Sequence, residues 1–211
     1  MTTSKGITLF RIIVLALAIG FWINQFFISD MDRFGIQFRF LTIWTLTFNM
    51  IIAAQMLRLS LGRSVVRMDA IVGLVIVMNI VVVVQYWRLI FIDPALVQSN
   101  GPLPWYREYY LHVLGPLLMW IDAFFILGAF RRVQGTCFCA LLIGLLYPLW
   151  IELLVRPMNT LPAGSVTNGL PYPFLNDLTL GGRMIFYSIS IGVNFVFIAI
   201  GVGLPRLIKL R

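Results

Sequence analysis

Residues 70–91 read AIVGLVIVMNIVVVVQYWRLIF, and this apolar run decides the class of fold. A helix needs roughly 20 apolar residues to cross a hydrocarbon core of about 30 Å. No residue of the run before Arg88 is charged, and its only side-chain amides are those of Asn79 and Gln85. The run therefore predicts a transmembrane helix.

The rest of the chain has the same character. Of its 211 residues, 60% are hydrophobic and 11% are charged, whereas soluble domains average about 45–50% and about 25%. We therefore expect an all-α membrane protein in which residues 1–211 form a single domain, a bundle of six transmembrane helices. The expected spans are residues 8–28, 38–57, 70–91, 109–130, 136–155 and 184–204.

The net charge of +8 is unevenly distributed along the chain. If the spans alternate across the bilayer, the side that holds both chain ends has many basic residues and only Asp69 as an acid. The basic residues on the other side are balanced by Asp30, Asp32, Asp93, Glu108, Glu152 and Asp177. This pattern follows the positive-inside rule and predicts cytoplasmic N and C termini. The positive charge then serves orientation and anionic lipid, so we expect no nucleic acid partner.

Two connections make predictions about packing. Residues 131–135 form a very short link, which predicts that the fourth and fifth spans are antiparallel neighbours. Residues 156–183 form the longest loop and are rich in Pro and Gly. Irregular backbone cannot face lipid, so we expect this loop to cover the outer mouth of the bundle.

Polar side chains recur at helical spacing within two of the spans. They are Thr42, Thr45 and Asn49 in the second span, and Tyr187, Ser190 and Asn194 in the sixth. Residues three and four apart share one face of a helix. Such residues commonly join membrane helices by hydrogen bonds, at about 0.6 to 2 kcal/mol each; the alternative is a polar site inside the bundle.

His112 is the only histidine of the chain, and it lies just inside the fourth span. An ionisable group within the membrane is a functional candidate by default. Thr42 and His112 each lie about one turn, roughly 5 Å, beyond the outer start of their helices, so they share one depth. A hydroxyl beside an imidazole is a minimal pair of nucleophile and base. The alternative for His112 is an interface histidine bonded to a loop.

Three residues near His112 bear on its role. Pro116 lacks an N–H group, so the helix should bend and leave the carbonyl of His112 free. Glu108 lies four residues earlier on the same face and is a candidate to orient the imidazole. Asp122 lies roughly 15 Å further along the axis, too far for contact, and its burial requires some other partner.

The sequence offers no recognisable cofactor or metal site. A single histidine rules out bis-histidine haem ligation, and a zinc site requires three or four N, O or S ligands. Cys137 and Cys139 are two residues apart on a helix and point away from each other, so they are apolar filler or palmitoylation sites. We expect neither a cofactor nor a metal.

Several short motifs occur in a characteristic order: Phe40-Leu41-Thr42-Ile43, His112 with Pro116, Tyr172-Pro173-Phe174-Leu175, Gly182-Arg183 and Asn194-Phe195. Together they resemble the androgen-induced protein family and its six-span bacterial relatives. The animal members are membrane hydrolases that cleave fatty acid esters of hydroxy fatty acids with a threonine and a histidine. The resemblance implies that Thr42 is the nucleophile and His112 the base. Two features fit the bacterial members of the family better than the animal members: the spacing from His112 to Pro116, and the presence of Asp122. The resemblance therefore implies a location in a bacterial inner membrane.

The leading hypothesis is therefore an intramembrane threonine hydrolase of a lipid ester, in which Thr45, Asn49 or Asn194 donates to the oxyanion. One alternative is a non-catalytic membrane protein, either a lipid or quinone binder or an accessory subunit. Another is a proton-coupled transporter that relays through His112 and Asp122, which the lack of an internal repeat disfavours. Oligomerisation, or assembly into a larger membrane complex, stays open.

Overall fold

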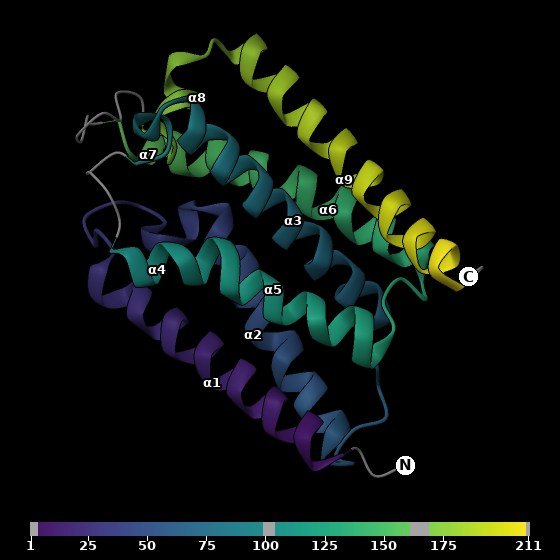
Figure 1. The fold of residues 1–211 in the computed structure, drawn as a ribbon. Helices are drawn as coiled ribbons and strands as arrows, with labels where there is room; N and C mark the ends of the chain where they lie inside the picture. The colour runs from purple at the N-terminus through teal and green to yellow at the C-terminus, as the bar shows by residue number, and fades with distance from the viewer. Residues whose placement is uncertain (1–3, 99–103, 161–168, 210–211) are drawn as a thin grey trace.

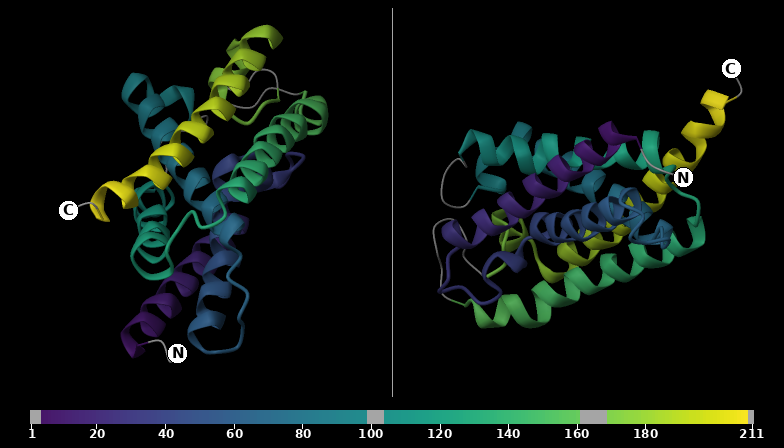
Figure 2. Two further views of the ribbon diagram at one scale, coloured as in Figure 1. Left: turned by 90° about the vertical axis from the view of Figure 1, so that its right-hand side faces the viewer. Right: turned by 90° about the horizontal axis from the view of Figure 1, so that it is seen from below.

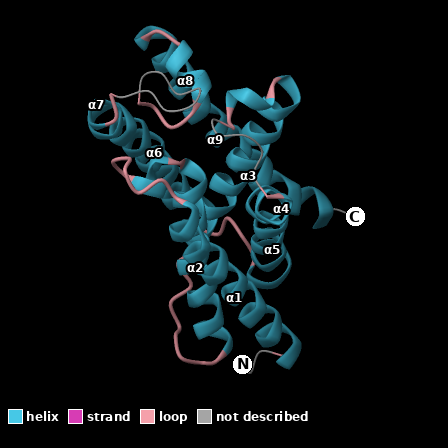
Figure 3. Ribbon diagram, turned by 90° about the vertical axis from the view of Figure 1, so that its left-hand side faces the viewer, coloured by secondary structure: helices cyan, strands magenta, loops and turns pink. Residues whose placement is uncertain are grey.

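The computed structural model describes residues 4–98, 104–160 and 169–209. Within these residues the chain forms helices and turns, with no strand (Figure 3). Five helical segments are long and apolar enough to cross a membrane: Lys5–Ile28, Asp69–Ile92, Trp105–Leu127, Val133–Met158 and Leu180–Gly203. The expected all-α membrane fold is confirmed.

One further long helix in the described part of the chain, α2 (Leu41–Ser60), lies among these five (Figure 1). It is less apolar, because Thr42, Thr45, Asn49 and Gln55 lie within it. The count of six spans, and the side of the membrane that each chain end faces, stay predictions.

The structure breaks the fourth and fifth spans into shorter elements that follow one another without a gap. Three of these, η3, η4 and η5, are π-helical turns. Besides α2, the elements of the described residues are, in chain order, α1 (Lys5–Ile28), η1 (Ile36–Arg39), α3 (Asp69–Ile92), η2 (Pro94–Leu96), α4 (Trp105–Tyr109), η3 (Tyr110–Leu114), α5 (Gly115–Ile121), η4 (Asp122–Leu127), α6 (Val133–Trp150), η5 (Ile151–Val155), α7 (Arg156–Met158), α8 (Pro173–Asp177) and α9 (Leu180–Lys209).

Helix α3 occupies the centre of the bundle (Figure 1). It packs against α2 on one side and against α6 and α9 on the other, and α1 packs against α2. Of its most apolar window, 56% is buried, against 17% for α1. A helix that is hydrophobic all round belongs in the interior, so the run of residues that decided the fold class also forms its core.

A close approach of two backbones holds α6 against α3. A Cβ atom at Gly73 of α3 would lie 2.2 Å from the hydroxyl oxygen of Thr136 on α6. Only glycine leaves room for that hydroxyl, which donates to the carbonyl of Ala70 at 3.3 Å. Small residues at such contacts are typical of helix packing in membranes.

The prediction that the fourth and fifth spans are packed neighbours is wrong. Helix α6 packs mainly against α3 and α9 instead. Between the two spans Gly128 and Phe130 adopt positive φ angles of 79° and 57°, and the chain turns away. A short link requires only that two helix ends lie close together, and α6 diverges from there.

Both chain ends lie at the same end of the bundle (Figures 1 and 2). At the opposite end lie α7 and α8, which belong to the long loop 156–183. Residues 161–168 of that loop lie outside the described residues. The described part does cover this end of the bundle, because Leu170 and Leu175 are buried at 0% and 2% exposure.

The second span begins later than expected. Residue 38 was the predicted start, but Ile36–Arg39 form the 3-10 turn η1 and α2 begins at Leu41. Gly35 has a φ angle of 80°, which favours glycine because it lacks a Cβ atom. This reversal turns the chain just before α2 and brings Gln37 and Arg39 to the polar chamber described below.

The fourth span is wound more widely around His112 than an ordinary helix. Residues Tyr110–Leu114 form the π turn η3, in which the Gly115 N–H donates to the Tyr110 carbonyl. The carbonyl of His112, which Pro116 leaves without its helical donor, accepts a hydrogen bond from the indole of Trp87 at 3.1 Å. The predicted free carbonyl is confirmed, and Trp87 satisfies it.

Candidate functional site

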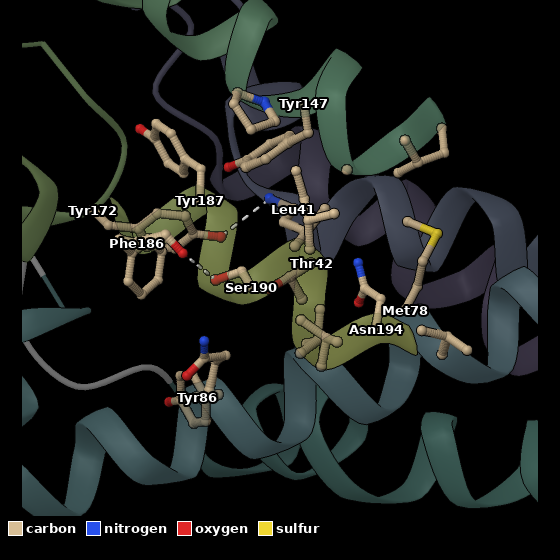
Figure 4. Close-up of a pocket in the computed structure, with 18 of the residues that line it drawn as sticks. Leu41, Thr42, Met78, Tyr86, Tyr147, Tyr172, Phe186, Tyr187, Ser190 and Asn194 are labelled. Atoms are coloured by element: carbon tan, nitrogen blue, oxygen red, sulfur yellow. Dashed lines mark hydrogen bonds between the residues drawn. The ribbon is translucent and has the colours of Figure 1, made fainter. Parts of the chain in front are cut away.

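Two cavities adjoin at the end of the bundle that holds α7 and α8. The apolar cavity, of ≈ 140 Å³, lies among α3, α6 and α9 and is lined by side chains such as Val77, Met78, Val81, Ile143 and Ile191 (Figure 4). The polar chamber, of ≈ 270 Å³, lies beside it and is lined by Gln25, Gln37, Arg39, Arg107 and His112 among others. The residues common to both walls are Thr42, Tyr86, Val97 and Tyr172.

Thr42 lies in the first turn of α2, at the wall between the two cavities. Its hydroxyl and its main-chain N–H lie close to the hydroxyl of Tyr172. The N–H of Leu41 donates to that same hydroxyl at 3.1 Å, the bond drawn in Figure 4. Tyr172 therefore caps the start of α2 and fixes the position of the Thr42 hydroxyl.

His112 lines the polar chamber together with Thr42 and is 3% exposed. Its Nδ1 lies 3.2 Å from the main-chain carbonyl oxygen of Glu108. A carbonyl only accepts, so in a neutral imidazole the hydrogen is on Nδ1 and the lone pair is on Nε2. Nε2 has no hydrogen bond to the residues that the structure describes. This is the tautomer that a general base requires.

The ring of Tyr86 stacks on the imidazole, with centroids 3.4 Å apart and planes 3° apart. Tyr86 is itself held by a hydrogen bond from its hydroxyl to the Glu108 carboxylate. Gln98 donates to the same carboxylate at 3.1 Å. Glu108 therefore acts on His112 in two ways: its main-chain carbonyl holds Nδ1 directly, and its carboxylate holds the stacked Tyr86.

Asp122 lies away from both cavities and forms a buried ion pair with Arg11. The Nε and Nη2 atoms of Arg11 lie 2.8 and 2.7 Å from the two carboxylate oxygens. Arg11 also donates to the Met56 carbonyl at 2.9 Å and to the Ser60 hydroxyl at 2.7 Å. The partner that the burial of Asp122 required is therefore Arg11, and the two residues tie α1 to the fourth span.

The expected oxyanion donors fall in different places. The hydroxyl of Thr45 donates to the Leu41 carbonyl of its own helix at 3.1 Å. Asn49 and Asn79 exchange two amide hydrogen bonds of 3.1 and 2.7 Å, which join α2 to α3. Neither Thr45 nor Asn49 lines the two cavities, whereas Asn194 of α9 lines the apolar cavity (Figure 4).

Tyr172 is a candidate site residue to which the sequence analysis assigned no role. Its only signal was its place in the Tyr172-Pro173-Phe174-Leu175 motif. Burial raises the pKa of Tyr172 above its ordinary value, so the side chain stays a neutral phenol. A neutral phenol donates hydrogen bonds and does not serve as a base, which leaves the basic role to His112.

The described residues contain no group of three or more His, Cys, Asp and Glu side chains placed to hold a metal ion. Cys137 and Cys139 are free thiols. The chemistry available at the junction of the two cavities is that of a hydroxyl, an imidazole and a phenol.

Residues 6–206 match a family model whose description is FAR-17a/AIG1-like protein. The match covers nearly the whole chain and confirms the resemblance to the androgen-induced family that the ordered motifs indicate. No curated protein and no solved structure matches the chain.

Proposed function

The chain belongs to the FAR-17a/AIG1-like protein family, and from this membership and the two cavities we propose that it hydrolyses lipid esters within the membrane, with Thr42 as the nucleophile and His112 as the base. One observation carries the proposal. Thr42 and His112 line the same polar chamber, and Thr42 also lines the apolar cavity. An ester carbonyl at Thr42 would have space for an acyl chain on one side and a base on the other.

The surroundings of His112 orient its ring for the role of a base. A hydrogen bond to the Glu108 carbonyl fixes its tautomer, and stacking on Tyr86 fixes its ring plane. A base that is orientated by a third group is the arrangement found in hydrolytic triads. Here the third group is the main-chain carbonyl of Glu108, which lies four residues before His112.

The reaction follows from these positions. The Thr42 oxygen attacks the ester carbonyl carbon while its proton moves to Nε2 of His112. The tetrahedral intermediate collapses, and the alcohol leaves with the proton from His112. His112 then takes a proton from a water molecule, which attacks the acyl-threonine; the bond between the acyl group and the Thr42 oxygen breaks, the fatty acid is released, and the proton on His112 returns to the Thr42 oxygen. The family resemblance favours a fatty acid ester of a hydroxy fatty acid as the substrate.

Two side chains are the candidates to stabilise the oxyanion. The Tyr172 hydroxyl touches the Thr42 hydroxyl, and the Asn194 amide lines the same apolar cavity as Thr42. Removal of one such donor costs about 10²–10³ in kcat in other enzymes. Tyr172 and Asn194 lie late in the sequence, whereas Thr42 and His112 lie earlier. The site therefore forms only when these parts of the chain pack together.

If both termini are cytoplasmic, the site faces the outer side of the membrane, which the resemblance implies is a bacterial inner membrane. Residues that line the polar chamber come from the end of α1, the start of α2 and the start of the fourth span, and this end of the bundle lies opposite the start of α1 (Figure 1). With cytoplasmic termini, as the distribution of charge predicts, Thr42 and His112 lie at the depth of the ester groups of the outer leaflet. Water then enters from the outer face.

The test is labelling of the purified protein in detergent by a fluorophosphonate, which reacts with an activated hydroxyl. We expect wild type to be labelled at Thr42, as mass spectrometry of the modified peptide would show. Thr42→Ala and His112→Ala should abolish labelling, and Thr42→Ser should retain it. Thr47→Ala is the matched control, because the hydroxyl of Thr47 bonds to the Ile43 carbonyl at 2.7 Å, away from both cavities.

The apolar cavity also favours a second candidate function, that of a lipid or quinone carrier without catalysis. Absence of labelling in folded wild type, together with tight retention of a lipid, would overturn the hydrolase and establish this alternative. Labelling that persists unchanged in Thr42→Ala would place the activated hydroxyl elsewhere and also contradict the proposal.

A further inference from the structure

The polar chamber contains more positive and amide groups than the hydrolytic step requires. Gln37 and Arg39 line it from η1, and Arg107 lines it from α4. The amide nitrogen and oxygen of Gln37 are buried, with 2% of the residue exposed, and find no hydrogen-bond partner among the described residues. The Nε atoms of Arg39 and Arg107 are buried and unpartnered as well. Buried polar groups without partners are rare unless they serve a ligand.

Both arginines keep N–H donors that no described residue uses. The guanidinium of Arg39 makes no hydrogen bond or ion pair with the residues that the structure describes; its one ring contact is with Phe40, at 5.1 Å. Arg107 donates from Nη2 to Gln25 at 2.6 Å, which holds the side chain in place. Its Nε donor is left over.

The turn that carries Gln37 and Arg39 is fixed rigidly. The Phe38 carbonyl accepts hydrogen bonds from the indoles of Trp44 at 2.7 Å and Trp150 at 3.1 Å. The hydroxyl of Tyr147 donates to the Arg39 carbonyl at 2.8 Å. A preorganised turn loses little entropy when a ligand binds, so these contacts suit a binding site.

The acids near the chamber are already engaged. Asp30 lines the chamber but pairs with Arg33 at 3.6 Å, and 39% of its side chain is exposed. Glu108 is occupied by Tyr86 and Gln98. Burial lowers the pKa of Arg39, although the negative charge of Asp30 acts in the opposite direction; the net lowering reflects the cost of holding the guanidinium charge away from water. An anion in the chamber would offset that cost.

We propose that Arg39, Arg107 and Gln37 form a binding site for an oxyanion, a carboxylate or a phosphate, that belongs to the lipid substrate. This inference rests on the proposed function: the ester lies at Thr42, an acyl chain enters the apolar cavity, and the anionic part of the same molecule occupies the polar chamber. The site would select lipid esters that carry a negative charge over neutral esters. Arginine is suited to the role because its planar fork matches both oxyanions.

A binding experiment tests the site without any turnover. Three pyrene-labelled probes are compared on protein that carries Thr42→Ala: a fatty acid, its methyl ester and the phosphate monoester of the corresponding alcohol. We expect the two anions to bind about tenfold or more tightly than the methyl ester, because hydrogen bonds between a guanidinium and an oxyanion are stronger than those to a neutral ester carbonyl. Whichever anion binds more tightly identifies the head group, carboxylate or phosphate.

Variants assign the preference to the named residues. Arg39→Gln and Arg107→Gln should each bring the affinity for the anions close to that for the methyl ester and leave the methyl ester unaffected. Arg39→Lys should keep part of the preference. Arg88→Gln is the matched control, since Arg88 is an exposed arginine on α3 that lines neither cavity. Equal binding of acid and methyl ester, or a preference that survives in both Gln variants, would overturn the site.

Fluorophosphonate labelling separates this inference from the proposed function, because the reactive probe is uncharged and does not need the arginines. Normal labelling of Arg39→Gln without an anion preference would overturn the anion site and leave the hydrolase standing. An anion preference in a protein that is never labelled would overturn the hydrolase, and with it the assignment of the anion to a substrate.

Discussion

The imidazole of His112 and the phenol ring of Tyr86 lie face to face, 3.4 Å between centroids and 3° between planes. The two residues come from the fourth span and from α3, so the stack joins the catalytic candidate to the centre of the bundle. A base on one helix is held in its plane by a ring on another. The geometry at Nε2 therefore depends on the packing of α3, and this dependence leads to the first prediction.

Loss of the stack should slow the reaction of Thr42 more than loss of the Tyr86 hydroxyl does. Tyr86→Phe keeps a ring against His112, whereas Tyr86→Leu lets the imidazole rotate, and misplacement of a catalytic group by about 1 Å can cost about 10²-fold. We expect the rate constant of fluorophosphonate labelling to fall at least tenfold in Tyr86→Leu and to change little in Tyr86→Phe. Equal rates for the two variants would show that the stack does not position the base.

Tyr172→Phe should lower kcat by about 10²-fold if the Tyr172 hydroxyl stabilises the oxyanion at Thr42. Burial raises the pKa of Tyr172, so the phenol keeps its proton above the ordinary pKa of about 10. The defect should thus be the same at pH about 6 and about 9. Steady-state kinetics measures it, with the exposed Tyr106 changed to Phe as the control. An effect on KM alone would refute the oxyanion role.

The ion pair of Arg11 and Asp122 should act on stability and not on chemistry. Asp122→Ala leaves a buried guanidinium unpaired, and such a loss costs about 3–5 kcal/mol. The double variant Arg11→Met with Asp122→Leu should regain most of the free energy of unfolding, because no charge is left buried. The free energy of unfolding in detergent is measured for wild type, Asp122→Ala and the double variant. If the double variant is as unstable as Asp122→Ala, the pair is not what stabilises this part of the bundle.

Asn49 and Asn79 should behave as a coupled pair between α2 and α3. Either single change to Leu leaves one buried amide without its partner, and we expect a loss of about 0.6 to 1.7 kcal/mol, the range for such bonds in membranes. Replacement of both residues by Leu should cost less than the sum of the two single changes. A strictly additive result from the same unfolding measurement would show that the amides do not depend on each other.

Much of this arrangement is readable from the sequence, because local chemistry decides it. Length and hydropathy alone predict the apolar helix of residues 70–91 and the other apolar helices that pack around it. The missing N–H of Pro116 predicts a free carbonyl at His112 without knowledge of what would bond it. A count of turns places Thr42 and His112 at one depth, and the structure puts both in the wall of one chamber.

The tertiary structure decided which side chains meet. The rotation of each helix about its axis depends on packing between residues far apart in sequence, so periodicity could not pair Arg11 with Asp122 or stack Tyr86 on His112. The same reason hid Tyr172, which reaches Thr42 across 130 positions of the chain from a loop that has no periodicity at all. The sequence determined a set of apolar helices with polar residues at one depth; only their packing decided which of those residues form a site.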